Sequence, residues 1–232
     1  MALESARTAF LGINKLIALP TDQLLDQFGG GGHAPGSGSA AALMALLSAQ
    51  LVSTVCKISS GRGDDARFRY VLERIEARTI PELKRLFQKD AEDFDKVIEI
   101  RVQRDKENDP VIKRRLRDQA LRLLEDSTDL VFAIADICIQ LVEFGLIVFD
   151  GGSKKVRGDS GAAIGSAIAG AMSSVFIINL NLTSFQNSRW AIQRRYQAEK
   201  LYENIIAKQE DAFRRIVTLQ PEVVDAIQPD LF

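Results

Sequence analysis

Histidine, cysteine and tryptophan are scarce in this sequence of 232 residues, which contains one, two and one of them respectively. A zinc site normally needs several His and Cys ligands at close spacing, so the sequence predicts no metal site. A Ser-His-Asp triad could be built only around His33. Cys56 and Cys138 lie in apolar runs without a CxxC partner. We therefore expect two buried, reduced thiols.

A strong charge of either sign is also lacking. The chain has 30 basic and 31 acidic residues and a formal net charge of -1. No global field attracts nucleic acid or an anionic membrane, so we expect neither as a partner. The first residues do not combine a basic start, an apolar core and a small-residue cleavage site, which argues against a signal peptide and for a cytoplasmic location.

No run of alternating apolar residues is long enough for a convincing β-strand, and the apolar residues recur with a helical period. The sequence predicts an all-α fold: an up-and-down bundle of long helices in a single domain, residues 1–232, with a core of about 20–215. Helices are expected at about 3–18, 21–27, 37–58, 64–103, 110–149, 159–182 and 188–218, with a short helix and tail at 221–232. Pro81 predicts a break or kink near Thr79. Ser37 or Ser39 is expected to cap the third helix, and Asp109 the helix that starts at Pro110.

Two expected helices are built largely from small or apolar residues, at 40–56 and 160–182. The second has 23 residues without a charge, enough in length for a membrane span. It is rich in Ala, Ser and Gly, however, and ends in Asn179 and Asn181 without an aromatic belt. The other helices are amphipathic, as in soluble bundles. We therefore expect these two helices at the centre of the bundle, or across a subunit interface, and not in a membrane.

A glycine-rich loop at 29–39 directly precedes the third expected helix. Free amides and the macrodipole at a helix N-terminus favour an anion or an electron-rich ligand edge. The loop is neither a phosphate-binding loop with GK[ST] nor a dinucleotide fingerprint after a strand. Taken alone, it is equally compatible with a plain connector.

Four motifs, in order along the chain, resemble those of the folate cyclodeaminase/cyclohydrolase family. Residues 33–42, HAPGSGSAAA, resemble the family's P-G-G-G-S-x-A-A segment, and residues 90–94, DAEDF, resemble its D-A-E-x-F. Gly158-Asp159-Ser160 is similar to its S-D-x-x-x-A, and Asn181-Leu182 to its I-N-L. The resemblance covers about residues 20–215. The sequence departs from the family pattern at Ser37, where a glycine is usual, in the turn at 61–64, and at Ile177.

The resemblance implies an enzyme of folate one-carbon metabolism that needs no cofactor beyond its tetrahydrofolate substrate. The family hydrolyses 5,10-methenyltetrahydrofolate to 10-formyltetrahydrofolate, or cyclises 5-formiminotetrahydrofolate with loss of ammonia. Both reactions pass through an electrophilic carbon between two nitrogens, where a carboxylate can stabilise positive charge and move a proton. No formiminotransferase domain is fused to this chain, so we expect the cyclohydrolase. The alternatives are the cyclodeaminase and a catalytically silent folate-binding or protein-binding helical protein.

The resemblance also assigns residues to roles. Asp90 is the expected catalytic carboxylate. Apart from the resemblance, His33 could act as an acid or base near neutral pH, but the family does not require it at this position, so it ranks below Asp90. The expected substrate-binding residues are Pro35, Gly36, Ser37, Gly38, Ser39, Asp159 and Asn181. Without a ligand role, Asp159 would be a plain N-cap and Asn181 would bond to protein backbone. Lys154, Lys155 and Arg157 could meet the glutamate tail of folate, or form a solvated loop. The small-residue helices and the family's habit of pairing predict a homodimer.

Overall fold

The chain folds into long helices, and its structure, a computed structural model, describes residues 16–60, 66–186 and 188–219. The main helices are α2 (Thr21–Gly29), α3 (Ser37–Ser59), α4 (Ala66–Arg74), α5 (Ile80–Lys106), α6 (Pro110–Gly151), α7 (Arg157–Leu182) and α8 (Arg189–Val217). The shorter turns are η1 (Leu16–Ala18), the π-helical η3 (Ile75–Thr79) and η4 (Lys154–Val156). No β-strand occurs in the described ranges, which confirms the all-α prediction.

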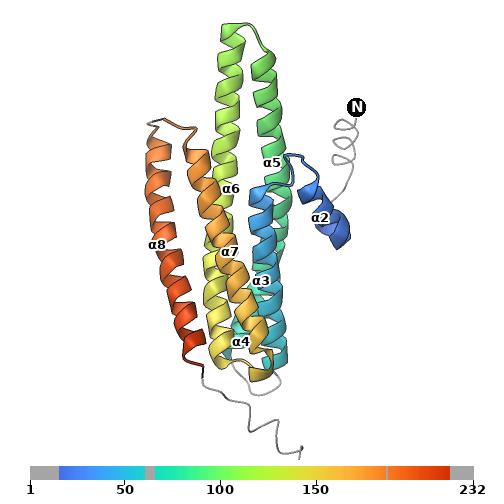
Figure 1. Cartoon of the computed structure of the whole chain (residues 1–232), viewed down its shortest axis with the longest axis vertical. Coiled ribbons are helices and arrows are strands. Elements are labelled where there is room, and N and C mark those ends of the chain that lie inside the picture. Colours follow the sequence, from blue (N-terminus) through green and yellow to red (C-terminus); the bar gives the residue numbers. More distant parts are fainter. Residues whose placement is uncertain (1–15, 61–65, 187, 220–232) are drawn as a thin grey trace, which may run out of the picture.

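The centre of the bundle is made up of α3, α5, α6 and α7 (Figure 1). α3 packs against α5 and α7, and α6 packs against the same two helices, so all four enclose one apolar core. In Figure 1, α3 and α6 run downward while α5 and α7 run upward, which is the predicted up-and-down arrangement. α8 lies outside this group against α7 and α6, and α5 and α6 extend beyond the other helices at the top.

Small residues allow α3 and α7 to approach closely at the centre. A Cβ added to Gly170 of α7 would lie 3.0 Å from the Ala41 carbonyl oxygen of α3 and 2.9 Å from Cys138 Sγ of α6. Ala41, Ala45 and Ala49 of α3 are fully buried. The two small-residue helices are therefore central, as the sequence predicts, and they pack backbone against backbone.

The expected break before Pro81 is a single π-helical turn between α4 and α5. The Ile80 N–H bonds to the Ile75 carbonyl, five residues back. Pro81 has no N–H to donate and its ring crowds the preceding turn, so a wider turn accommodates it and the helix continues into α5. The irregularity predicted near Thr79 is therefore a π-helical turn within a continuous helix and not a break.

Two predicted helix starts are wrong. The cap of α3 is Gly36, not Ser37 or Ser39, and it makes no side-chain capping bond. α7 starts at Arg157, two residues before the expected start, and Asp159 lies in its first turn without capping it. The cap of α6 is confirmed, since Asp109 Oδ1 accepts the Val111 N–H at 2.7 Å. The helix expected at 3–18, the turn at 61–64 and the segment at 221–232 fall wholly or mostly outside the described residues.

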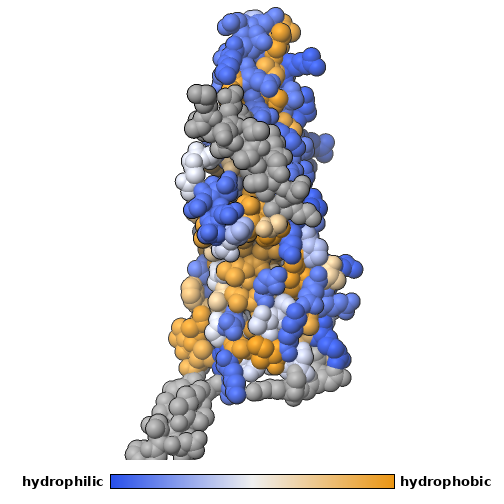
Figure 2. Space-filling model, turned by 90° about the vertical axis from the view of Figure 1, so that its right-hand side faces the viewer, coloured by the Kyte–Doolittle hydropathy of each residue, from blue (hydrophilic) through white to orange (hydrophobic). Residues whose placement is uncertain are grey.

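Three helices, α3, α6 and the stretch Lys154–Leu182, are long and apolar enough to cross a membrane by length and composition. Their most apolar windows are 61%, 61% and 44% buried, so the stretch that contains α7 is the least covered of the three. Its exposed face carries Phe176 and Leu180, at 72% and 70% exposure. α3 adds Leu47, which is 55% exposed. Figure 2 shows hydrophobic residues gathered in the middle and lower part of the side that faces its viewer.

The two cysteines are free and buried. Burial raises the pKa of Cys138 to about 12, and burial together with the nearby Glu76 carboxylate raises the pKa of Cys56 to about 11. Both thiols therefore stay protonated at neutral pH, which confirms the prediction of inert core cysteines.

Candidate functional site

Asp90 projects from α5 against the first turn of α3. Its side chain is buried, and its Oδ2 accepts a hydrogen bond from Ser39 Oγ at 2.8 Å. The Ser39 backbone N–H also donates to this carboxylate. Gly38 makes the approach possible, because a Cβ at this position would lie 2.1 Å from Asp90 Oδ1. Three of the predicted site residues thus meet in one contact between two helices.

Two opposing effects act on the pKa of Asp90. Burial is the larger and raises the pKa above the ordinary value; the hydrogen bonds from Ser39 lower it, and nearby Asp93 raises it. The net shift is upward. The carboxylate also faces the positive end of the α3 dipole, which favours its ionised form. A buried carboxyl whose pKa is raised toward neutrality is suited to accepting and returning a proton.

The other acidic residues of this motif have different surroundings. Asp93 is buried but paired with both Lys89 and Lys96, with Lys96 Nζ at 3.2 Å. Glu92 is exposed on the opposite side of α5 and accepts a hydrogen bond from Gln88 at 2.9 Å. Within the described residues, Asp90 pairs with no lysine or arginine, so it is the buried carboxylate of this motif that no basic side chain neutralises.

The site residues predicted in the loop before α3 differ in their exposure to solvent. Pro35 is buried, Gly36 is half-buried and Ser37 is exposed, as is His33. Gly36 offers no side chain to the first turn of α3, so the Ser37 and Gly38 amides receive no capping bond from it. The loop and Asp90 therefore lie at the same end of α3, as the sequence predicts.

Asn181 lies near the upper end of α7, and its side-chain amide donates to Thr128 Oγ1 of α6 at 3.2 Å. Thr128 in turn donates to the Leu124 carbonyl at 2.6 Å. The partner of Asn181 is thus a side chain of α6, whereas the sequence analysis expected protein backbone or a ligand. Asn181 is half-buried, and its carbonyl side is not used in this bond. No sequence signal distinguished Thr128 from the other polar residues of α6.

Asp159 lies at the other end of the bundle. It precedes Gly170 by eleven residues, a rise of about 16 Å, and Gly170 packs on α3 below the level of Gly38. Asp159 is therefore roughly 20 Å or more from Asp90 along the bundle. Lys154, Lys155 and Arg157 lie in the same region as Asp159, and Arg157 stacks on the Phe149 ring at 5.6 Å. Within one chain these residues and Asp90 do not form one site.

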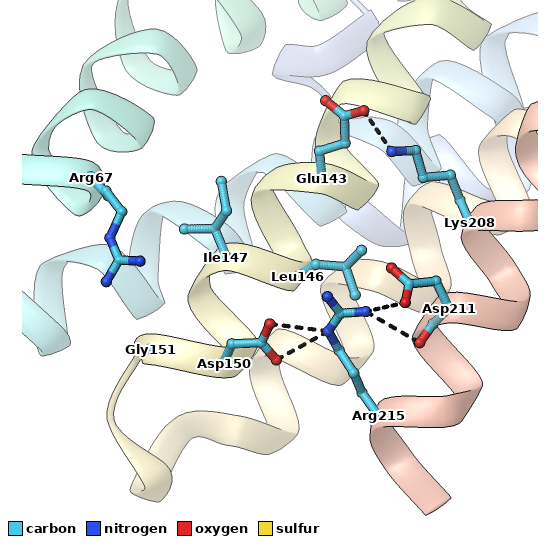
Figure 3. Close-up of a pocket in the computed structure, with 9 residues that line it drawn as sticks. All are labelled: Arg67, Glu143, Leu146, Ile147, Asp150, Gly151, Lys208, Asp211 and Arg215. Atoms are coloured by element: carbon cyan, nitrogen blue, oxygen red, sulfur yellow. Dashed lines mark hydrogen bonds and ion pairs between the residues drawn. The ribbon is translucent and has the colours of Figure 1, made fainter. Parts of the chain in front are cut away.

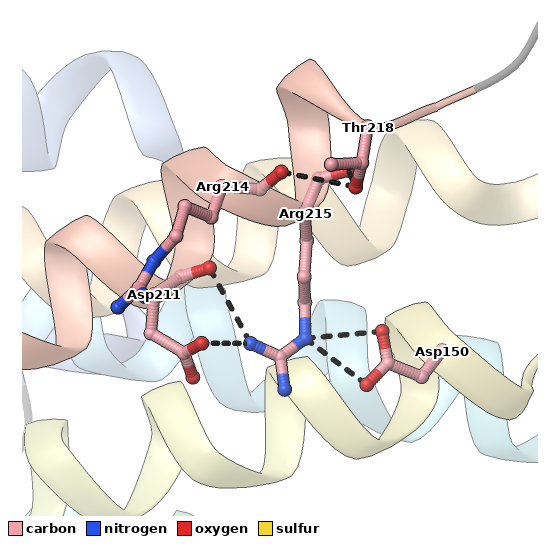
Figure 4. A network of polar contacts seen from close by, with 5 residues as sticks. All are labelled: Asp150, Asp211, Arg214, Arg215 and Thr218. Atoms are coloured by element: carbon pink, nitrogen blue, oxygen red, sulfur yellow. Dashed lines mark hydrogen bonds and ion pairs between the residues drawn. The ribbon is translucent and has the colours of Figure 1, made fainter.

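A groove of about 470 Å³ lies between α6 and α8, but its charges are already paired (Figure 3). Lys208 of α8 bonds to Glu143 of α6 at 2.7 Å. Arg215 of α8 bonds to Asp150 of α6 at 3.0 Å and to Asp211 at 2.5 Å. Figure 4 shows Arg215 held between these two carboxylates. This groove is best explained as an ionic clamp that fastens α8 to the bundle.

Comparison with known proteins agrees with this architecture. The family model described as formiminotransferase-cyclodeaminase matches residues 20–200. Methenyltetrahydrofolate cyclohydrolase of Methylorubrum extorquens is 28% identical over 186 residues, which cover 78% of this chain and 87% of that protein. The crystal structure of formiminotetrahydrofolate cyclodeaminase from Thermotoga maritima superposes with a TM-score of 0.73 at 14% identity, covering 86% of this chain and 96% of that one. At 14% identity, the similarity to the cyclodeaminase structure establishes the fold alone.

The helical bundle, the glycine-rich loop against a buried aspartate and these similarities define a protein of the folate cyclodeaminase and cyclohydrolase class. Since the family model matches well over half of the sequence, the chain belongs to the formiminotransferase-cyclodeaminase family. The family resemblance of the four sequence motifs is thereby confirmed.

Proposed function

We propose that this protein hydrolyses 5,10-methenyltetrahydrofolate to 10-formyltetrahydrofolate, with Asp90 as the catalytic carboxylate. The observation that carries the proposal is the buried, unneutralised Asp90, placed by Ser39 and Gly38 at the N-terminus of α3. The relative from Methylorubrum extorquens, which bears the name of this activity, supports it.

Asp90 is suited to each proton transfer that this reaction requires. The methenyl carbon between N5 and N10 is cationic, and an ionised carboxylate beside it stabilises that charge. Water adds to the carbon and gives one proton to Asp90. The carbon–N5 bond then breaks as the added hydroxyl becomes the formyl carbonyl and loses its proton to solvent. Asp90 returns its proton to N5, which leaves the carboxylate ready for another turnover.

The amides at the start of α3 and the side chain of Asn181 are proposed to hold the folate ring system. Pro35, Gly36, Ser37 and Gly38 shape the loop beside Asp90, and Asn181 lies above it at the end of α7. Both regions offer uncharged donors, which suit the amide-like edge of a pterin. The substrate is the only small molecule this reaction needs, and a cytoplasmic location is proposed with it.

The decay of 5,10-methenyltetrahydrofolate absorbance tests the proposal with wild-type protein and Asp90→Asn. Faster decay with the wild type than in buffer, lost in the variant, is the expected result. Decay at the buffer rate with both proteins would contradict it. Ammonia release from 5-formiminotetrahydrofolate tests the second candidate, which the family model and the fold of the Thermotoga maritima enzyme favour. Inactivity on both substrates would indicate the catalytically silent relative.

We also propose that the protein is a homodimer joined through the uncharged faces of α3 and α7. Exposed positions on α7 recur at helical spacing as Ala162, Gly165, Ala169, Phe176 and Leu180, without a charge among them. An exposed apolar face of this length on a soluble protein is typical of a subunit interface. A two-fold axis is expected to generate such an interface, because the same patch then meets itself.

This dimer would also explain the placement of Asp159. Asp90 is level with the first turn of α3, and Asp159 lies in the first turn of α7 at the other end of the bundle, so the middle of the shared face falls between their levels. A two-fold axis that crosses the shared face there would bring Asp159 of the partner subunit level with Asp90. The substrate-binding role predicted for Asp159 is therefore proposed to act across the interface.

A further inference from the structure

A second pocket lies beyond the N-terminus of α3. α5 and α6 continue upward past the point where α3 begins (Figure 1), and a pocket of about 630 Å³ lies between these two helices and the turn that joins α7 to α8. Its lining includes Arg101 and Arg104 of α5, Arg117 of α6 and Ser184 of the turn. The sequence motifs did not single out any of these residues.

The surroundings of this pocket are strongly basic. Residues 101–122 contain eight Lys and Arg but four Asp and Glu, although the whole chain has a net charge of -1. Three guanidinium groups line the pocket together with one carboxylate, Glu125. Arg104 and Arg117 each pair with the acidic residue that follows them, at 2.8 and 3.6 Å. Arg101 forms no ion pair with any residue of the described ranges, so the pocket retains excess positive charge.

The pocket is aligned with Asp90. Arg101 follows Asp90 by eleven residues, which is three helical turns and a rise of about 16 Å on the same face of α5. The Cα–Cβ bonds of a helix tilt toward its N-terminus, which for Arg101 on α5 is the direction of Asp90. On the other side, the Ser184 N–H donates to the Asn181 carbonyl at 3.0 Å, which joins the pocket to the end of α7.

We propose that Arg101, Arg104 and Arg117 form the subsite for the carboxylate end of the substrate; this inference rests on the proposed folate activity. A p-aminobenzoyl group separates the reacting carbon of folate from its glutamate carboxylates by roughly 10 Å. If the reacting carbon lies at Asp90, this length and the reach of an arginine side chain together span the rise of about 16 Å between Asp90 and Arg101. Guanidinium groups bind carboxylates with charge-assisted, often bidentate hydrogen bonds. These arginines would therefore favour substrates that carry the glutamate carboxylates.

Steady-state kinetics with 5,10-methenyltetrahydrofolate test the subsite through Arg101→Gln. The expected result is a KM raised about tenfold with kcat nearly unchanged, since the lost contact acts on binding and not on the reacting carbon. Arg114→Gln is the matched control, because Arg114 is an exposed residue of the same basic stretch, 101–122, and does not line the pocket. Its KM should stay within twofold of the wild-type value. An equal rise in both variants would overturn the subsite and leave a general charge effect.

A binding measurement separates failure of the subsite from failure of the proposed reaction. Isothermal titration with p-aminobenzoylglutamate needs no turnover, and its affinity should fall about tenfold in Arg101→Gln and remain unchanged in Arg114→Gln. The double variant Lys154→Gln/Lys155→Gln should also bind as the wild type does. Equal affinity in wild type and Arg101→Gln, or a loss confined to the double lysine variant, would refute the assignment whether or not the protein turns over folate.

Discussion

Gly38 of α3 and Asp90 of α5 are in such close contact that no side chain fits between them. A Cβ on Gly38 would lie 2.1 Å from Oδ1 and 2.6 Å from Cγ of Asp90. Ser39, the next residue, donates its hydroxyl to the same carboxylate. The glycine supplies space and the serine supplies a donor, so adjacent residues of one helix fix a carboxylate carried by another.

Gly38→Ala should therefore destabilise the protein and displace Asp90. The clash involves buried groups of both helices, and we expect a loss of about 2 kcal/mol of unfolding free energy, the usual range for overpacking. Urea denaturation measures it. Gly158→Ala is the matched control, because nothing lies within 4 Å of a Cβ there and alanine favours the helix. If Gly38→Ala were as stable as this control, the tight contact with Asp90 would be wrong.

The rate of methenyltetrahydrofolate hydrolysis should fall as the pH drops through the pKa of Asp90. The proposed reaction needs the ionised carboxylate, and burial raises this pKa above its ordinary value. The acid limb of kcat/KM should therefore lie at a higher pH than an exposed aspartate would give. Asp90→Asn should lower kcat by about 10²–10⁴ at every pH. A variant that kept wild-type turnover would remove Asp90 from the mechanism.

The same ionisation has a consequence for stability. Because the pKa of Asp90 is raised in the folded state, folded protein binds this proton more tightly, and stability is lost as the pH rises through that pKa. Asp90→Asn removes this cost. With rising pH, the unfolding free energy of the variant should increase relative to that of the wild type between the ordinary pKa of an unfolded aspartate and the raised pKa of Asp90. The difference should level off below this interval and above it. A constant difference across the whole pH range would show that the pKa of Asp90 is not raised.

Ser39→Ala tests whether Ser39 tunes the carboxylate. Its hydrogen bonds lower the pKa of Asp90, against the effect of burial. Removal of the hydroxyl should raise this pKa further and move the acid limb of the rate profile to higher pH, with activity retained at alkaline pH. A purely structural serine would change the unfolding free energy and leave the position of the limb unchanged.

Helical periodicity was sufficient to predict the bundle, and Pro81 an irregularity near Thr79. The family resemblance of the motifs predicted that the Gly36–Ser39 segment and Asp90 belong to one site. The first residues of the helices could be predicted less well from the sequence. Asp159 has the residue type of an N-cap, yet α7 starts at Arg157, because local propensity does not decide which of several adjacent residues begins a helix. The separation of Asp159 from Asp90 depends on the direction and length of α7, which motif order alone does not reveal. The arginine pocket was missed because its members come from two helices and a turn.

Charge placed at the centre of the shared α3–α7 face should separate the proposed dimer. Ala169→Arg buries an unpaired guanidinium in an otherwise uncharged interface and should yield monomers at micromolar concentration, as measured by light scattering. Folate turnover should fall in parallel if Asp159 acts across the interface. Ile192→Arg, at an exposed position of α8, is the control and should leave the oligomeric state unchanged. A wild-type protein that is already monomeric would contradict the proposal outright.

Arg215→Gln should loosen α8 without affecting catalysis. Arg215 is held by Asp150 of α6 and Asp211 of α8, and its side chain is 30% exposed, so solvent screens part of the interaction. We expect a loss of about 1 kcal/mol in urea denaturation, which should shrink at high salt because the contact is ionic. Lys200→Gln breaks a pair within α8 alone and should cost less. The Arg215 ion pairs and Asp90 lie at different levels along the bundle, so turnover should stay at the wild-type level. A large fall in kcat would mean that the α6–α8 groove, and not the α3–α5 contact, belongs to the active site.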